Sequence, residues 1–131
     1  GQIDGVKVKM KDDKEKTVKA KAVVVTTGGF GANEKLITQY KPELKNYVTT
    51  NQEGTTGDGI QMIQKVGGAL VDMKEIQIHP TVQQSDAFLI GEAVRGEGAI
   101  LASQKGERFV NELDTRDKVS AAINALPEKS A

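Results

Sequence analysis

The sequence predicts an α+β fold, in which short antiparallel strands and three helices share one small chain. Two observations lead to this class. Several short apolar stretches are bounded by glycine, proline or charged residues, which is typical of strands separated by turns. Three other segments repeat apolar residues at helical spacing, each behind a polar residue that can cap a helix.

The first element is a predicted β-hairpin followed by a buried strand. Residues 2–25 are predicted to be β structure: Ile3, Val6 and Val8 are apolar with polar flanks, residues 11–15 form a charged turn, and Val18 marks the returning strand. Residues 22–25 form an uninterrupted apolar run, which is typical of a strand covered on both faces. We therefore expect residues 22–25 to belong to a sheet larger than this chain supplies.

Three helices are predicted from their caps and their apolar faces. The expected N-caps are Asn33, Asp58 and either Asp114 or Thr115. The apolar faces are Leu36, Ile37 and Tyr40 in the first helix, Ile60, Ile63 and Val66 in the second, and Val119, Ala122, Ile123 and Leu126 in the third. The residues expected to end these helices are Pro42, Gly67 with Gly68, and Pro127.

The remaining segments predict short strands and one further turn. Strands are expected at residues 69–73, 76–78 and 87–90, and a hairpin at residues 100–110 around a Lys-Gly turn. The glycine-spaced segment 91–98 is predicted to be a turn or a short helix.

Composition excludes several classes of function. The 18 Lys and Arg residues balance 18 Asp and Glu residues, so there is no basic surplus for nucleic acid or for an anionic membrane. The absence of cysteine excludes a disulfide framework, and a single histidine excludes a multi-histidine metal site within this chain. No apolar run approaches the ~20 residues of a membrane helix. A first residue other than Met suggests a processed chain or a piece of a longer one.

His79 is the only imidazole, and two interpretations compete for it. A lone histidine after an apolar strand is more often a buried structural residue than a ligand-binding one. The alternative is a hydrogen-bond donor to an anionic substrate, because either ring nitrogen can donate.

Two charged motifs are candidates for chemistry. Glu92 and Arg95 lie three residues apart between glycines, either as a surface ion pair or as a pair that organises protons in a cleft. Arg116 lies near a predicted helix start, where a cation is unfavourable and an anion site shared with backbone N–H groups is a reason for its presence. For Asp114, Thr115 and Asp117 we favour capping and solvation.

Two glycine turns complete the set of motifs, Thr27-Gly28-Gly29 and Thr56-Gly57-Asp58-Gly59. Each lets the backbone approach a neighbour closely, but neither is specific alone. The dinucleotide fingerprint G-x-G-x-x-G is absent, so the chain is not a complete Rossmann domain by itself.

Taken together, these segments resemble the flavoprotein fumarate reductase and flavocytochrome c group, in the wider succinate dehydrogenase/fumarate reductase flavoprotein family. Residues 22–33 are similar to the family's strand and glycine turn near FAD, and residues 56–59 to its second FAD-side motif. The segments that match the family's capping domain, in order and spacing, are residues 79–81, 92–96, 106–112 and 115–117.

The resemblance implies an FAD-dependent oxidoreductase that reduces the C=C bond of an unsaturated dicarboxylate such as fumarate. It implies hydride transfer from flavin N5 and proton donation from Arg116, with Glu92 and Arg95 returning a proton to Arg116. His79, Gly91 and Glu92 would bind the substrate. Gly91 replaces the hydroxyl residue that is frequent in the family, which leaves room for other unsaturated acids, as in urocanate and methacrylate reductases, or for steroids. The residues implied to contact FAD are Thr56, Gly57, Asp58, Gly28 and Gly29.

The resemblance also implies how the chain is divided and what it needs. Residues 1–32 would be the carboxy-terminal edge of an FAD-binding segment, and residues 33–131 a capping domain that closes over the substrate. The rest of the FAD-binding domain, and a later part with a further substrate His and Arg, would lie outside this chain. We therefore expect the isolated chain to hold FAD weakly and not to turn over.

The remaining expectations concern partners and compartment. The expected partners are a small unsaturated carboxylate, the remainder of the FAD-binding domain and an unidentified electron donor, without nucleic acid or membrane insertion. The compartment is expected to be a soluble bacterial one, cytoplasmic or periplasmic. The alternative interpretation is a non-catalytic ligand-binding or interaction module that keeps the cap fold.

Overall fold

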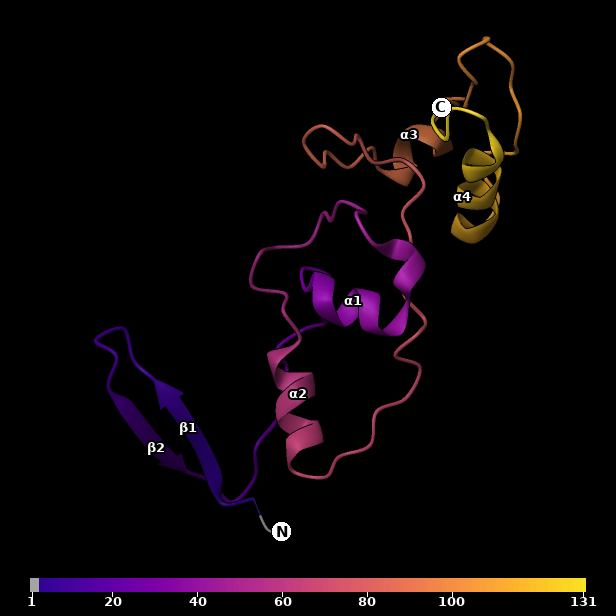
Figure 1. The fold of residues 1–131 in the computed structure, drawn as a ribbon. Helices are drawn as coiled ribbons and strands as arrows, with labels where there is room; N and C mark the ends of the chain where they lie inside the picture. Colours follow the sequence, from indigo (N-terminus) through magenta and orange to yellow (C-terminus); the bar gives the residue numbers. More distant parts are fainter. Residues whose placement is uncertain (1–2) are drawn as a thin grey trace.

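The computed structural model describes residues 3–131, and Figure 1 shows its elements in chain order. The strands β1 (Gly5–Lys9) and β2 (Glu15–Lys19) come first, as an antiparallel pair. The helices that follow are α1 (Glu34–Tyr40), the short 3-10 helix η1 (Pro42–Leu44), α2 (Asp58–Lys65), α3 (Glu92–Gly96) and α4 (Arg116–Ala125). This mixture confirms the α+β class over the described residues.

The β1–β2 hairpin forms where the apolar residues with polar flanks and the charged turn predict it. Val6 lies opposite Val18 in the ladder, and the Met10 N–H donates to the carbonyl of Lys14 at 2.8 Å to close the turn. Asp13 takes a left-handed φ of 61° there, a conformation that aspartate tolerates in turns. The hairpin extends away from the helices in Figure 1. Residue 2, where β structure was expected to begin, lies outside the described residues.

The strand expected at residues 22–25 is not formed within the described part of the chain. The segment has no ladder partner, and the Val24 side chain is 84% exposed. Since a strand is defined by its pairing, an apolar run with no neighbouring strand stays a single extended segment.

The other expected strands are wrong or reduced to single bridges. Residues 69–73 and 76–78 pair with nothing within the described range. The run at 87–90 keeps one bridge, between Val82 and Leu89, and the 100–110 hairpin keeps one, between Ala102 and Arg108. A ladder requires a second run in register over several consecutive residue pairs, and in the described part of the chain these runs meet a partner at one pair or at none.

Local capping explains where α1 and α2 begin. Asn33 Oδ1 accepts the Leu36 N–H at 3.1 Å, which confirms the predicted N-cap of α1. The predicted N-cap of α2 is wrong, because Gly57 takes that position and Asp58 is the first helical residue. Gly57 has a left-handed φ of 78°, which glycine adopts at little cost. Gly67 follows α2 with a φ of 92°, as a helix-ending glycine does.

The last two helices follow their predictions. The glycine-spaced segment forms α3, with Gly91 as its N-cap, and Thr115 precedes α4. Within α4, Val119 and Ile123 are buried, as their spacing predicts.

The buried apolar core of the described residues is small. It consists of Leu44, Val119 and Ile123. Large apolar side chains remain more than 60% exposed at Val24, Val71, Phe88 and Leu113. Exposed apolar surface of this extent is typical of a face that packs against further protein. Among residues 3–131, no helix combines the length and the apolarity that crossing a bilayer requires.

Candidate functional site

The starts of α3 and α4 bring two guanidiniums to one carboxylate oxygen. Glu92 is the first residue of α3 and Arg116 the first residue of α4. Arg116 Nε donates to Glu92 Oε1 at 2.5 Å, and Arg95 Nη2 lies 3.8 Å from the same oxygen. The hydrogen bond from Arg116 is the main reason why the pKa of Glu92 lies below its ordinary value. The same bond raises the pKa of Arg116. Both groups are therefore charged at rest.

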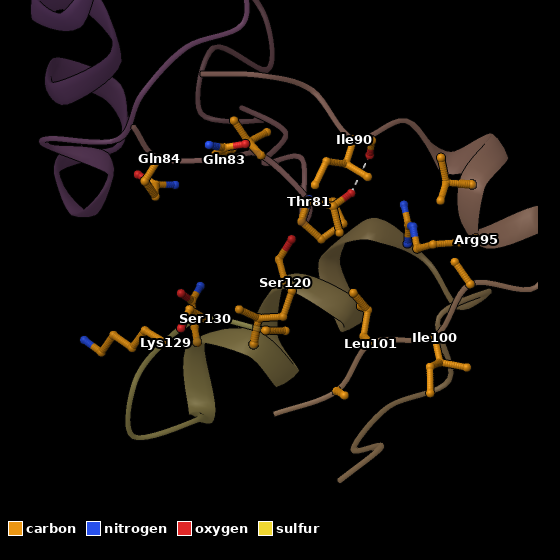
Figure 2. A pocket seen from close by; sticks show the side chains of 18 residues that line it. Thr81, Gln83, Gln84, Ile90, Arg95, Ile100, Leu101, Ser120, Lys129 and Ser130 are labelled. Carbon is orange, nitrogen blue, oxygen red and sulfur yellow. Dashed lines mark hydrogen bonds between the residues drawn. The ribbon is translucent and has the colours of Figure 1, made fainter. Parts of the chain in front are cut away.

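Arg95 is buried, although it carries a charge. Its side chain is 5% exposed, and its Nη1 donates to the carbonyl of Glu112 at 2.9 Å. Its Nε and Nη2 have no hydrogen-bond partner in the described part of the chain. Figure 2 shows its guanidinium facing a cavity of about 480 Å³ that Thr81 and Ser120 also line. Unpaired buried donors beside open space are the setting in which ordered water binds.

His79 is influenced by the same charges. Burial is the largest reason why the pKa of His79 lies below its ordinary value of 6.5, and the Arg116 charge lowers it further. Glu92 acts in the opposite direction. The Thr81 N–H donates to His79 Nδ1 at 3.3 Å, which leaves the proton of the neutral ring on Nε2. His79 is thus a neutral imidazole whose Nε2–H can donate. We call His79, Glu92, Arg95 and Arg116 the charge cluster.

A second cavity, of about 590 Å³, joins the histidine segment to the start of α1. Gln77 and His79 line one part of it, and Gly31 and Ala32 line another. Gly91, at the N-cap of α3, has open space where a side chain would begin. The cavity is large enough for a small carboxylate, and His79 is the member of the charge cluster that lines it.

Gln77 is a site residue that the sequence interpretation missed. Its Oε1 accepts from Arg116 Nη1 at 2.7 Å, so it holds the second branch of that guanidinium. Gln77 lies two residues before His79. Alternate residues of an extended segment share a side, and this period is the signal that points to Gln77 beside His79.

The two glycine turns lie against each other. A Cβ on Gly59 would stand 2.7 Å from Val25 Cγ1 and closer still to Thr27 Oγ1, so α2 packs on residues 25–27 without room for a side chain. Thr56 Oγ1 donates to Asp58 Oδ1 at 2.8 Å beside them. Gly28 has a φ of 75°, and neither it nor Gly29 has a neighbour within 4 Å of where a Cβ would lie.

This open glycine face fits a group that must approach the backbone closely. Exposed N–H groups in a glycine turn and at the start of a helix are suited to a phosphate-bearing cofactor such as FAD. The described residues contain no cluster of three or more His, Cys, Asp or Glu residues that could hold a metal ion.

Comparison with known proteins identifies relatives of this chain. The family described as "FAD binding domain" matches residues 1–130. The chain is 53% identical to the NADH:fumarate oxidoreductase of Klebsiella pneumoniae over 131 residues, covering 99% of this chain and 14% of that protein. It is 47% identical to "Fumarate reductase (cytochrome)" of Shewanella frigidimarina, covering all of this chain and 23% of that protein.

A solved structure is also similar. The open conformation of a flavocytochrome c3 fumarate reductase matches 98% of this chain and 23% of its own, with a TM-score of 0.75 and 39% identity. The chain thus spans less than a quarter of the length of these relatives. On the family match and these likenesses, the chain belongs to the FAD binding domain family, among the flavoproteins of the fumarate reductase and flavocytochrome c group.

Proposed function

We propose that this chain is part of a longer FAD-dependent oxidoreductase that reduces the C=C bond of an unsaturated dicarboxylate, with fumarate as the first candidate. The observation that carries the proposal is the convergence of Arg116 and Arg95 on one oxygen of Glu92, beside the neutral His79. Under this proposal Arg116 is the proton donor, Glu92 and Arg95 return a proton to it, and His79 binds the anionic substrate.

The chain divides into two parts under this proposal. Residues 1–32 form the carboxy-terminal edge of an FAD-binding segment, and residues 33–131 form a domain that caps the substrate. Two observations support the need for further protein around this chain. The β1–β2 hairpin pairs only with itself among the described residues, and the buried core is too small for the amount of apolar surface left exposed. The isolated chain therefore holds FAD weakly and does not turn over.

Arg116 is the proposed proton donor. FAD, when bound, supplies the hydride for one alkene carbon. Arg116 delivers a proton to the neighbouring carbon. A guanidinium ordinarily keeps its proton, so the transfer requires rapid resupply. Glu92 hydrogen-bonds Arg116 Nε directly, and Arg95 Nη2 lies 3.8 Å from the same Glu92 oxygen, at ion-pair distance, while Arg95 lines the 480 Å³ cavity. Protons therefore reach Arg116 through Arg95 and Glu92 without leaving it neutral for long.

Thr56, Gly57, Asp58, Gly28 and Gly29 are the proposed contacts to FAD. The support is the packing of α2 on residues 25–27, which brings the two glycine turns together, with Gly28, Gly29 and Asp58 exposed and Gly57 buried. Asp58 and Thr56 already hydrogen-bond each other there, so they present an ordered polar edge.

His79, Gly91 and Glu92 are proposed to define the end of the substrate site. The Nε2–H of neutral His79 donates to a substrate carboxylate, which lets negative charge build on that group during reduction. Gly91 contributes no side chain there and leaves open space.

Replacing His79 by alanine in the full-length flavoprotein is expected to raise KM and to lower kcat together. The donor is lost both from the bound substrate and from the charge that develops on it, and removal of one such donor costs about 10²–10³ in kcat. Steady-state kinetics checks this result. The His79→Gln variant keeps an N–H donor and should recover part of the loss. Unchanged KM and kcat in His79→Ala would remove the carboxylate-binding role.

A screen of electron acceptors tests the proposed reaction. The FAD-loaded full-length protein, supplied anaerobically with a reduced viologen dye, should oxidise the dye with fumarate at least about a hundredfold faster than with methacrylate or crotonate. The second carboxylate is the reason, because a monocarboxylate leaves a half-buried donor such as His79 without its acceptor. A faster rate with urocanate than with fumarate would make urocanate the substrate. If no unsaturated acid caused the dye to be oxidised, the proposed reaction itself would be wrong.

A further inference from the structure

Glu112 is a buried carboxylate outside the charge cluster. Its side chain is 3% exposed, and both of its oxygens accept hydrogen bonds. Arg108 Nε donates to Oε1 at 2.9 Å and Arg108 Nη2 to Oε2 at 2.6 Å, while the Leu101 N–H donates to Oε1 at 2.9 Å. These contacts, with the one from Arg108 the largest, lower the pKa of Glu112 to about 2. The carboxylate therefore stays ionised and fixed between two segments.

The backbone of the same residue holds Arg95. The Glu112 carbonyl accepts from Arg95 Nη1 at 2.9 Å, and it is the one hydrogen-bond acceptor that the guanidinium has among residues 3–131. Arg95 Nη2 lies 3.8 Å from Glu92, too far for a hydrogen bond to set its direction. The direction in which Arg95 presents its protons thus depends on where the Glu112 carbonyl stands.

Glu112 also lies at the entrance to α4. The turn after it closes through the Asp114 N–H, which donates to the carbonyl of Asn111 at 3.1 Å, and Arg116 begins the helix four residues after Glu112. One anchored residue therefore precedes Arg116 in the chain and supports Arg95 in space. Both guanidiniums lie within ion-pair distance of the same oxygen of Glu92.

We propose that Glu112 is a positioning residue for proton delivery, because its pinned carboxylate fixes the backbone carbonyl that orients Arg95 toward Glu92. The inference rests on the proposed function and adds to it a residue that does not touch substrate or cofactor. If it is right, a change at the Glu112 carboxylate lowers kcat by misplacing Arg95 and leaves substrate binding almost unchanged.

Glu112→Gln in the FAD-loaded full-length protein is the principal test. A glutamine offers one oxygen and one NH₂, so one of its ends must face an N–H donor that the carboxylate accepted. The Glu112 segment then shifts and Arg95 loses its direction. We expect kcat to fall about tenfold to a hundredfold, with KM changed less than about twofold, because small misplacements of a reacting group cost that much. The matched control is Glu107→Gln, an exposed carboxylate five residues earlier in the chain, which should leave both constants unchanged.

A double-mutant cycle separates this role from a general structural one. In an Arg95→Lys background, Glu112→Gln should cause no further loss of kcat, because the group through which it acts is already altered. A full further loss, or an unchanged kcat in Glu112→Gln alone, overturns the inference. Should Glu112→Gln fail to fold, Arg108→Lys replaces it in the cycle, because lysine cannot reproduce the two-pronged contact.

The cycle also tells apart the failure of this inference from failure of the proposed function. An Arg95→Lys enzyme with normal kcat overturns the relay and, with it, the role of Glu112. An impaired Arg95→Lys enzyme in which Glu112→Gln remains fully additive keeps the relay and removes only the role of Glu112. FAD content and Tm, measured on each variant, should match the parent protein where the loss is one of positioning.

Discussion

Replacing Arg116 by alanine in the full-length flavoprotein is expected to leave FAD bound and to lower kcat by about 10²- to 10⁴-fold, the range that a positioned acid supplies. The guanidinium is held at two points, by Glu92 at 2.5 Å and by Gln77 at 2.7 Å, so no other described donor can take its place at the same spot. The FAD contacts are proposed on the glycine turns, away from α4 in the sequence. Steady-state kinetics and flavin absorbance check both halves of this result.

Two variants sharpen this test. Lys118→Ala removes a cation from the same helix, one that pairs with Asp114 at 3.2 Å, and should leave kcat unchanged. Arg116→Lys keeps the charge but loses the second branch that Gln77 holds, and should stay strongly impaired. A normal rate in Arg116→Ala would remove the assignment of the proton donor.

Replacing Gly59 by alanine is expected to reduce both the FAD content and the stability of the full-length protein. The added Cβ would stand 2.7 Å from Val25 Cγ1 and closer to Thr27 Oγ1, so both side chains or the backbone of α2 must shift. Overpacking of this kind costs about 1–3 kcal/mol. The change also pushes α2 away from residues 25–27 and separates the two glycine turns.

Gly54→Ala is the matched control for Gly59→Ala. It adds the same methyl group a few residues earlier, where no atom lies within 4 Å of the new Cβ. The control should keep FAD and Tm at the level of the parent protein. Thermal unfolding followed by circular dichroism, together with the flavin-to-protein absorbance ratio, makes the comparison. Full FAD content and an unchanged Tm in Gly59→Ala would contradict the proposed closeness of the two turns.

Features set by neighbouring residues were predictable from the sequence. The β1–β2 hairpin, the Asn33 cap and the short helix α3 each depend on a few consecutive residues. Strand pairing depends on partners that are distant in the sequence. Residues 22–25 therefore have the composition of a strand but no paired strand beside them in the described part of the chain. The error at Asp58 has a tertiary cause as well. Gly57 is buried, and a Cβ there would stand 2.7 Å from Phe30 Cβ, a contact that local capping preferences do not include.

The candidate site divides in the same way. Arg116, Glu92 and His79 were singled out because charged or ionisable residues in glycine- and proline-punctuated motifs are visible in the sequence. Gln77 and Glu112 were not assigned roles, since a neutral amide carries no charge signal and Glu112 acts on Arg95 through a backbone carbonyl. The type of a residue does not reveal which contacts its main-chain atoms make, so such contacts cannot be predicted from the sequence pattern.

The two guanidiniums at one Glu92 oxygen affect how a charged ligand approaches the site. Two guanidiniums and one carboxylate leave a surplus of one positive charge, to which the neutral His79 adds nothing. Under the proposed function, a dicarboxylate near this charge cluster is attracted before contact, and dissolved salt screens that attraction beyond about 10 Å. The same surplus of positive charge does not attract an uncharged molecule of equal size. Under the proposed function, the charge cluster therefore favours a dianion already during its diffusion to the site, before any contact is made.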